Sequence, residues 1–301
     1  MIRIRLHGRG GQGIKTASQI LGTAAYLSDF QAQDFPLYGA ERRGAPIVAF
    51  TRIAPDPVLE RGPISRPDLL LIGDETLLDD NQAAPLCGAD ADTVIFINSR
   101  EDAGSLKNRL ALNADPATLD LTDLCFKELG QGNILSSALA AAGARLLGNI
   151  PLDKFVDAMK SELTLQGLAP DLMQKNVRLA EDVYKALPAV SIKVRDAVDL
   201  EPSTLVQLEQ KRVEDSAPII LAPGNMALRK TGNWRTERPI IDYSHCNKCL
   251  ICYARCPDGA IHVGVDGEPE IDYDHCKGCL ICARECPGHY IQTVRESEVQ
   301  K

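Results

Sequence analysis

Eight of the ten cysteines in this 301-residue chain lie between residues 246 and 286. They form two runs of the pattern C-x2-C-x2-C-x3-C-P, at Cys246, Cys249, Cys252, Cys256-Pro257 and at Cys276, Cys279, Cys282, Cys286-Pro287. Three cysteines on a tight loop can surround one face of an iron–sulfur cube, and the fourth, after the longer gap, then points toward a second cube. The spacing therefore predicts two [4Fe–4S] clusters and hence one-electron chemistry.

We expect the two runs to exchange their last ligands. The predicted ligands are Cys246, Cys249, Cys252 and Cys286 for the first cluster, and Cys276, Cys279, Cys282 and Cys256 for the second. The alternative metal is zinc, but four-cysteine zinc sites usually pair two C-x2-C units across a longer span. Three cysteines at consecutive short intervals, in a motif that occurs twice, favour iron–sulfur clusters.

The rest of the composition describes an ordinary globular protein. The hydrophobic fraction is 45%, the net charge is −8 and only 5% of residues are aromatic, which argues against a nucleic-acid partner. No apolar run approaches the ~20 residues that span a bilayer. The start MIRIRLHGRGGQG carries no secretory leader, so we expect a cytoplasmic protein in which dense cysteine indicates metal rather than disulfides. Cys87 and Cys125 are predicted to be plain buried thiols.

Residues 1–188 are predicted to form an α/β domain with a mostly parallel sheet. Strand-like apolar runs occupy 2–8, 46–53, 68–74 and 93–98, and helical patterns occupy 14–28, 134–148, 152–163 and 176–187. Residues 189–239 lose this periodicity and read as a linker or extended arm. Residues 240–301 are predicted to form a second domain, a bacterial-type two-[4Fe–4S] ferredoxin of α+β fold, in which IIDYSHCNKCLICYARCPDGAI is echoed by EIDYDHCKGCLICARECPGHYI. This duplication predicts two similar halves, and Tyr290 takes the place that Ala260 has in the first.

A glycine-rich turn follows the first strand, at Gly8, Gly10, Gly11 and Gly13. A strand, a glycine turn and a helix start together suit anion binding, but close packing or a subunit contact explains the glycines equally well. Asp34 is the one candidate for the acidic residue that a dinucleotide site would need. His7 is expected to be packed rather than catalytic.

The stretch YGAERRGAPI is the second candidate for ligand contact. Tyr38, Glu41, Arg42 and Arg43 fall in a predicted loop before a buried strand. Adjacent arginines suit a phosphate or a partner's carboxylate, although a solvated charged turn would look the same.

These segments together resemble a known enzyme family. HGRGGQGIKTASQILG, FPLYGAERRGAPIVAFTRI and LGQGNILSSALAAAG resemble the gamma component of 2-oxoacid:ferredoxin oxidoreductases, and ALRKTGNWRTERPIIDYSHCNKC resembles the start of the delta, two-cluster ferredoxin component. The chain thus resembles a gamma–delta fusion over nearly its whole length. The ERRGAP form is closer to the pyruvate branch, which oxalate and arylglyoxylate enzymes also resemble.

The resemblance implies a complex rather than a self-sufficient enzyme. Nothing in this chain resembles a thiamine-diphosphate motif, so alpha and beta subunits would bind thiamine diphosphate, Mg²⁺ and the 2-oxo acid. The resemblance also implies that the complex is a dimer of heterotrimers. This chain would relay the electrons of oxidative decarboxylation through its two [4Fe–4S] clusters to ferredoxin or another acceptor. Arg42 and Arg43 are the candidate contacts for coenzyme A or a partner, and Gly10, Gly11 and Gly13 for an anion or an interface.

Two other functions compete with this interpretation. A self-contained, nucleotide-dependent ferredoxin reductase would use the glycine turn and would require bound flavin or a response to NAD(P)H. A ferredoxin-like electron carrier that works alone would need neither partner nor nucleotide.

Overall fold

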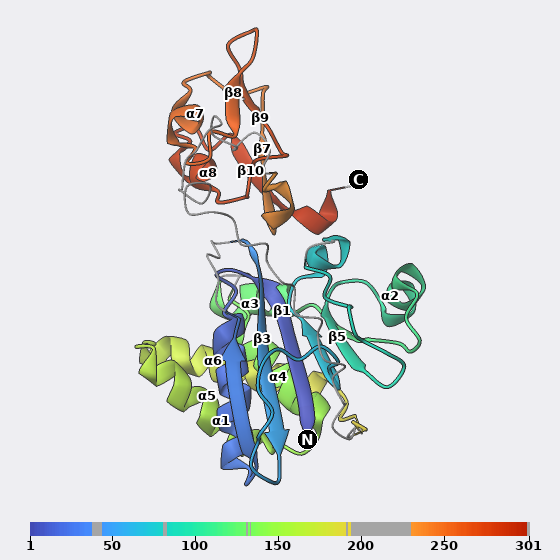
Figure 1. Ribbon diagram of the computed structural model, residues 1–301. Helices are drawn as coiled ribbons and strands as arrows, with labels where there is room; N and C mark the ends of the chain where they lie inside the picture. Colours follow the sequence, from blue (N-terminus) through green and yellow to red (C-terminus); the bar gives the residue numbers. More distant parts are fainter. Residues whose placement is uncertain are drawn as a thin grey trace, which may run out of the picture.

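The computed structural model describes residues 1–37, 44–80, 83–130, 132, 134–190, 192–193 and 230–299. Figure 1 shows an α/β domain formed by the first part of the chain and a small domain formed by residues 230–299, which sits above one edge of the larger sheet. Within the described residues, no helix combines the length and the apolarity needed to cross a lipid bilayer.

The larger domain is built on a six-stranded mixed sheet in the order β2-β3-β1-β4-β5-β6. Its strands are β1 (Ile2–Arg9), β2 (Gln31–Pro36), β3 (Pro46–Ala54), β4 (Leu69–Ile72), β5 (Val94–Asn98) and β6 (Ala117–Leu119). The neighbours from β1 through β4 and β5 to β6 pair in parallel, whereas β3 is antiparallel to both β1 and β2. The predicted mostly parallel sheet is confirmed, with β3 as its antiparallel member.

Helices cover the two faces of this sheet unequally (Figure 1). Helices α1 (Ile14–Leu27) and α4 (Ser136–Leu147) pack against the strands, and α5 (Leu152–Leu165) and α6 (Pro170–Ala186) pack on those two. The small residues of α4 allow this close approach, since a Cβ added at Gly143 would lie 2.8 Å from Leu71 Cδ1. The opposite face is covered by α2 (Ala103–Leu110), and α3 (Leu121–Leu129) packs beside α6.

The alternation of apolar and basic residues at the start of the sequence places them on opposite faces of strand β1. Ile4 and Leu6 are fully buried against the helices, while Arg5 and His7 are buried on the other face. The Nη1 and Nη2 groups of Arg5 donate hydrogen bonds to backbone carbonyls, including that of Pro85 at 2.9 Å, whereas its buried Nε has no hydrogen-bond partner among the described residues. Burial, with the nearby Arg5, lowers the pKa of His7 to about 3, so His7 is a neutral packed side chain at ordinary pH.

The small domain is a duplicated α+β unit. Each half contributes one short helix, α7 (Ile251–Arg255) or α8 (Ile281–Glu285), and two strands, β7 (Glu237–Ile241) and β8 (Ile261–Val263) or β9 (Pro269–Ile271) and β10 (Ile291–Arg295). The first strand of each half pairs with the last strand of the other: β7 with β10, and β9 with β8. The two halves thus contain the same elements, as the internal repeat predicts, and they exchange strands with each other.

Some elements differ from the sequence expectation. Strands β2 and β6 and helices α2 and α3 were not anticipated, because they are short or only half-buried and so carry little hydrophobic period. Strand β7 begins at Glu237, inside the predicted arm 189–239, of which residues 191 and 194–229 lie outside the described residues. The domain limits therefore stay a prediction.

The packing of α5 makes a testable case for this core. Phe155 is fully buried, whereas Leu165 on the same helix is 80% exposed. Phe155→Ala should lower the free energy of unfolding of the larger domain by about 3–5 kcal/mol, because it leaves a cavity. Leu165→Ala is the matched control and should change it by less than ~0.5 kcal/mol. Similar losses in the two variants, measured by chemical denaturation, would contradict the assignment of the core.

Candidate iron–sulfur centres

Both cysteine runs adopt the same loop, which turns into a short helix at the third cysteine. Lys248 and Leu250 in the first loop have φ values of 56° and 56°, and Gly278 and Leu280 in the second have 69° and 61°. Such left-handed residues are uncommon outside glycine. Their repetition at equal positions shows that the two loops are wound in the same way.

The last cysteine of the first run lies with the thiols of the second run. Burial raises the pKa of Cys282 to about 12, and the nearby thiols of Cys276, Cys279 and Cys256 are among the groups that raise it further. Burial also raises the pKa of Cys252, to which Cys246 and Cys249 add in the same way. Cys256 thus lies near Cys276 and Cys282, and the exchanged ligand set stays a prediction.

The donor set suits iron–sulfur cubes. All eight thiols are free, and five of them join a small core of aliphatic side chains that includes Ile241, Ile261 and Ile291. Backbone N–H groups of Ala260 and Tyr290 donate to the sulfurs of Cys256 and Cys286 at 3.3 and 3.4 Å. In the described part of the chain, no three Cys, His, Asp or Glu side chains converge tightly enough for a single metal ion, whereas a cube takes each thiolate at a separate iron.

A buried ionic group lies beside the second loop, and the sequence analysis did not single it out. Arg235 is 4% exposed and donates to the Cys276 carbonyl at 2.6 Å. Glu296 accepts two hydrogen bonds from Arg235, at 3.0 and 2.9 Å, and two from Arg238, at 3.0 and 2.6 Å. Burial alone would raise the pKa of Glu296, but these bonds outweigh it and hold the pKa below its usual range.

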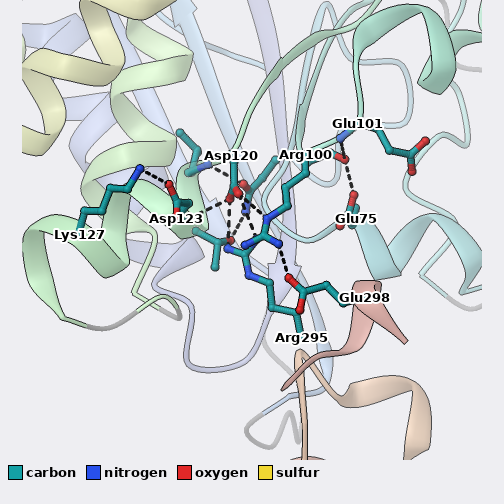
Figure 2. Close-up of polar contacts among 12 residues, drawn as sticks. Glu75, Arg100, Glu101, Asp120, Asp123, Lys127, Arg295 and Glu298 are labelled. Carbon is teal, nitrogen blue, oxygen red and sulfur yellow. Dashed lines mark hydrogen bonds and ion pairs between the residues drawn. The ribbon is translucent and has the colours of Figure 1, made fainter. Parts of the chain in front are cut away.

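A second ionic group joins the two domains, and Figure 2 shows it in detail. Arg295 at the end of β10 donates two hydrogen bonds to Asp120, at 3.0 and 3.2 Å. Arg100 donates to the same carboxylate at 2.9 Å and also pairs with Glu298. Asn233 adds a contact to Asp80 at 2.9 Å. We call Arg100, Asp120, Arg295 and Glu298 the interdomain clasp.

The interdomain clasp lies at the edge of the six-stranded sheet where the parallel strands β1, β4, β5 and β6 end. A cavity of about 60 Å³ remains there, lined from the larger domain by residues that follow β1, β4, β5 and β6 and from the small domain by Thr236, Glu237, Arg295 and Ser297. Open α/β sheets bind ligands at this edge, in sites of ~300–1,000 Å³. The small domain therefore covers part of this edge, and beside the clasp a second cavity of about 630 Å³ lies between Glu75 and Arg100 of the larger domain and Arg238 and Glu296 of the small one.

The glycine turn also meets the small domain. Gly10, Gly11 and Gln12 line a cavity of about 70 Å³ whose other wall includes Lys277–Leu280 of the second cysteine loop. The turn is tightly packed, since a Cβ on Gly13 would lie 2.8 Å from Ser136 Cβ. The Gly10 N–H donates to the Ala45 carbonyl, 2.8 Å away. These contacts favour packing and interface over anion binding.

The other predicted contacts are placed unevenly. Asp34 lies beside Gly22 in the middle of α1, where a Cβ on Gly22 would be 3.1 Å from Asp34 Oδ1, and so does not meet the glycine turn. Tyr38, Glu41, Arg42 and Arg43 lie outside the described residues. Of the two remaining cysteines, Cys125 is buried as predicted, whereas Cys87 is exposed, which corrects the prediction for it. Cys87 lies in a turn that covers the Arg5 side chain and contributes its carbonyl rather than its thiol.

Comparisons with known proteins match both parts of the chain. The model of the family described as pyruvate ferredoxin/flavodoxin oxidoreductase matches residues 3–186, and that of the 4Fe-4S dicluster domain matches residues 238–287. The pyruvate synthase subunit PorC of Methanothermobacter marburgensis is 35% identical over 185 residues, which are 62% of this chain and 98% of the relative. The common gamma subunit of the pyruvate/ketoisovalerate oxidoreductases of Pyrococcus furiosus is 34% identical over 62% of this chain and 96% of the relative.

A solved structure agrees with these matches. The crystal structure of a pyruvate oxidoreductase subunit from Thermotoga maritima is 30% identical and has a TM-score of 0.51, over 61% of this chain and 95% of that one. Each of these similarities is confined to a little under two thirds of the chain. The matches to these three relatives therefore cover the larger domain, and the dicluster domain at residues 238–287 is matched by its own family model.

The interdomain clasp yields a prediction. Asp120→Asn removes the charge that Arg295 binds, yet an asparagine can still cap α3, where Asp120 Oδ1 accepts from the Asp123 N–H at 2.9 Å. With Arg295→Gln in a double-mutant cycle, the coupling in the free energy of unfolding should be about 0.5–3 kcal/mol. Lys127, whose ion pair with Asp123 lies at the surface, provides the control: Lys127→Gln should show no coupling with Arg295→Gln. A zero coupling for Asp120 with Arg295 would contradict the clasp.

Proposed function

This chain belongs to the pyruvate ferredoxin/flavodoxin oxidoreductase family, and we propose that it is the electron-transfer subunit of a thiamine-diphosphate-dependent 2-oxoacid:ferredoxin oxidoreductase. Its proposed parts are a gamma-type domain over 1–188, an arm over 189–239 and a two-cluster ferredoxin domain over 240–301. The observation that carries the proposal is the union of a gamma-type domain with a dicluster domain whose cysteine loop lies against the glycine turn.

The cysteines define the part of the reaction that this chain performs. We assign Cys246, Cys249, Cys252 and Cys286 to one cluster and Cys276, Cys279, Cys282 and Cys256 to the other. A bound [4Fe–4S] cluster supplies one-electron transfer. The side chains hold the sulfurs in an aliphatic shell formed by Ile241, Ile261 and Ile291, and the N–H groups of Ala260 and Tyr290 stabilise charge on the sulfurs.

Catalysis of decarboxylation is assigned to partner subunits. Alpha and beta subunits would carry thiamine diphosphate and Mg²⁺ in a dimer of heterotrimers, and the relatives named for pyruvate support pyruvate as the substrate. Oxalate and arylglyoxylates are the alternative substrates. Ferredoxin or another carrier is the proposed acceptor. Arg42 and Arg43 are the proposed contacts for coenzyme A or a partner subunit, and Gly10, Gly11 and Gly13 are proposed to serve the interface.

The alternative of a nucleotide-dependent reductase has less support. The glycine turn packs against the second cysteine loop, and Asp34 stands away from that turn. The alternative of a lone electron carrier does not account for the gamma-type domain.

The exchanged ligand set can be tested by iron content. The unchanged chain, reconstituted without oxygen, should bind about eight iron atoms. Cys256→Ala and Cys276→Ala should each lose about four, and their combination should lose no more, because both residues would serve one cluster. Cys256→Ala with Cys246→Ala should lose nearly all.

The reverse result, in which Cys256→Ala and Cys246→Ala together still leave one cluster, would show that each run binds its own cube. Cys125→Ala is the control for substitution of a buried cysteine outside the runs, and it should leave the iron content unchanged.

The enzyme assignment requires the native complex. Anaerobic purification through a tag on this chain should bring down thiamine-diphosphate subunits, and the complex should reduce a viologen dye with pyruvate when coenzyme A is present. Reduction with oxalate or an arylglyoxylate would keep the mechanism and change the substrate. An intact iron–sulfur spectrum without thiamine subunits and without dye reduction by any 2-oxo acid would refute the assignment.

A further inference from the structure

The two cysteine loops have the same shape but different surroundings. In the first loop, Lys248 occupies the left-handed position and its amine reaches Glu268 at 3.1 Å near the surface. In the second loop, the equivalent residue is Gly278, where a Cβ would lie 2.3 Å from the Glu237 carbonyl and 2.9 Å from Arg235 Cγ. Glycine is therefore required only in the second loop, because the segment 235–237 lies directly on it.

This segment brings a buried positive charge to one loop and not to the other. The Arg235 side chain is 5% exposed, and its Nη1 donates to the backbone carbonyls of Tyr273 and Cys276. The corresponding carbonyl region of the first loop receives no arginine among the described contacts. The two loops of the repeat can therefore be compared with each other: among the described contacts, only the Cys276 loop has a buried arginine against its backbone.

The charge is only partly neutralised. Arg235 and Arg238 both bind the single carboxylate of Glu296, and both lie over the ring of Tyr273, at 5.3 and 4.4 Å. The neighbouring Lys277 is already paired with Asp258, at 2.8 Å. The group of Arg235, Arg238 and Glu296 therefore carries one net positive charge next to Cys276.

We propose that Arg235 makes the reduction potential of the cluster bound by Cys276, Cys279, Cys282 and Cys256 higher than that of the other cluster. The inference rests on the ligand sets of the proposed function. Reduction adds one electron to a cluster and makes it more negative by one unit, so a buried cation stabilises the reduced form. A single electron delivered by an external reductant should therefore reside on the Cys276 cluster, the one that faces the glycine turn of the gamma-type domain.

Two substitutions should shift this potential in opposite directions. Arg235→Gln removes the cation and should lower the potential of one cluster while leaving the other nearly unchanged. Glu296→Gln removes the neutralising carboxylate and should raise the potential of the same cluster. Arg235→Lys keeps the charge and should restore most of the original potential. A loss of packing alone would not move the two potentials with opposite signs.

The measurement is an anaerobic redox titration of the full chain, followed by electron paramagnetic resonance. Lys230→Gln is the matched control, because Lys230 is a cation paired with Asp274 near the same loop but is 69% exposed, so its removal should shift neither potential. If Arg235→Gln fails to assemble clusters, Glu296→Gln decides by its upward shift.

The outcomes separate the two levels of inference. Two clusters whose potentials stay unchanged in the Arg235 and Glu296 variants, or that shift together in one direction, would overturn the role of Arg235 while leaving the clusters in place. Absence of two [4Fe–4S] signals from the unchanged chain would overturn the proposed ligand sets themselves.

Discussion

Strand pairing between the two halves of the small domain is the constraint on which the rest of the structure depends. Strand β7 pairs with β10 through Ile241 and Ile291, and β8 pairs with β9 through Ile261 and Ile271. Each half is thereby completed by the other, and Cys256 is carried to the thiols of the second run. The proposed exchange of ligands therefore depends on this pairing between the halves.

The same pairing determines which side of the small domain faces the larger domain. Arg235 and Glu296 flank one end of the β7–β10 sheet, and Arg295, the last residue of β10, reaches Asp120 of the clasp from that same end. The second loop consequently faces the larger domain, while the hairpin of β8 and β9 points away from it (Figure 1). The two halves of the repeat thus have different surroundings, so the two proposed clusters would differ in their distance from the larger domain.

Much of this arrangement could be predicted from the sequence, and the exceptions have physical causes. The cysteine spacing predicted the dicluster domain because the three closely spaced cysteines of each run are set by local distances along the chain, whereas the exchange of ligands between the runs stays a prediction. The buried helix at 134–148 was predictable from its unbroken run of small and apolar residues. The strand β2 was not, because its half-exposed QAQDFP shows no strong hydrophobic period.

The charged contacts were harder to foresee. Arg235 and Arg238 appeared only as part of a resemblance, and Asp120 and Arg295 did not stand out at all. Their partners lie 61, 58 and 175 positions away, so their function depends on how the domains dock rather than on local pattern. Arginines and carboxylates of this kind look in the sequence like any solvated surface charge.

The most direct test of the account is rapid-freeze electron paramagnetic resonance on the native complex, mixed without oxygen with pyruvate and coenzyme A. We predict that signals from reduced [4Fe–4S] clusters of this chain appear within the turnover time and are lost when Cys256 and Cys246 are both replaced by alanine. Release of CO₂ at the full rate, with the clusters of this chain still oxidised, would contradict a role as the electron relay.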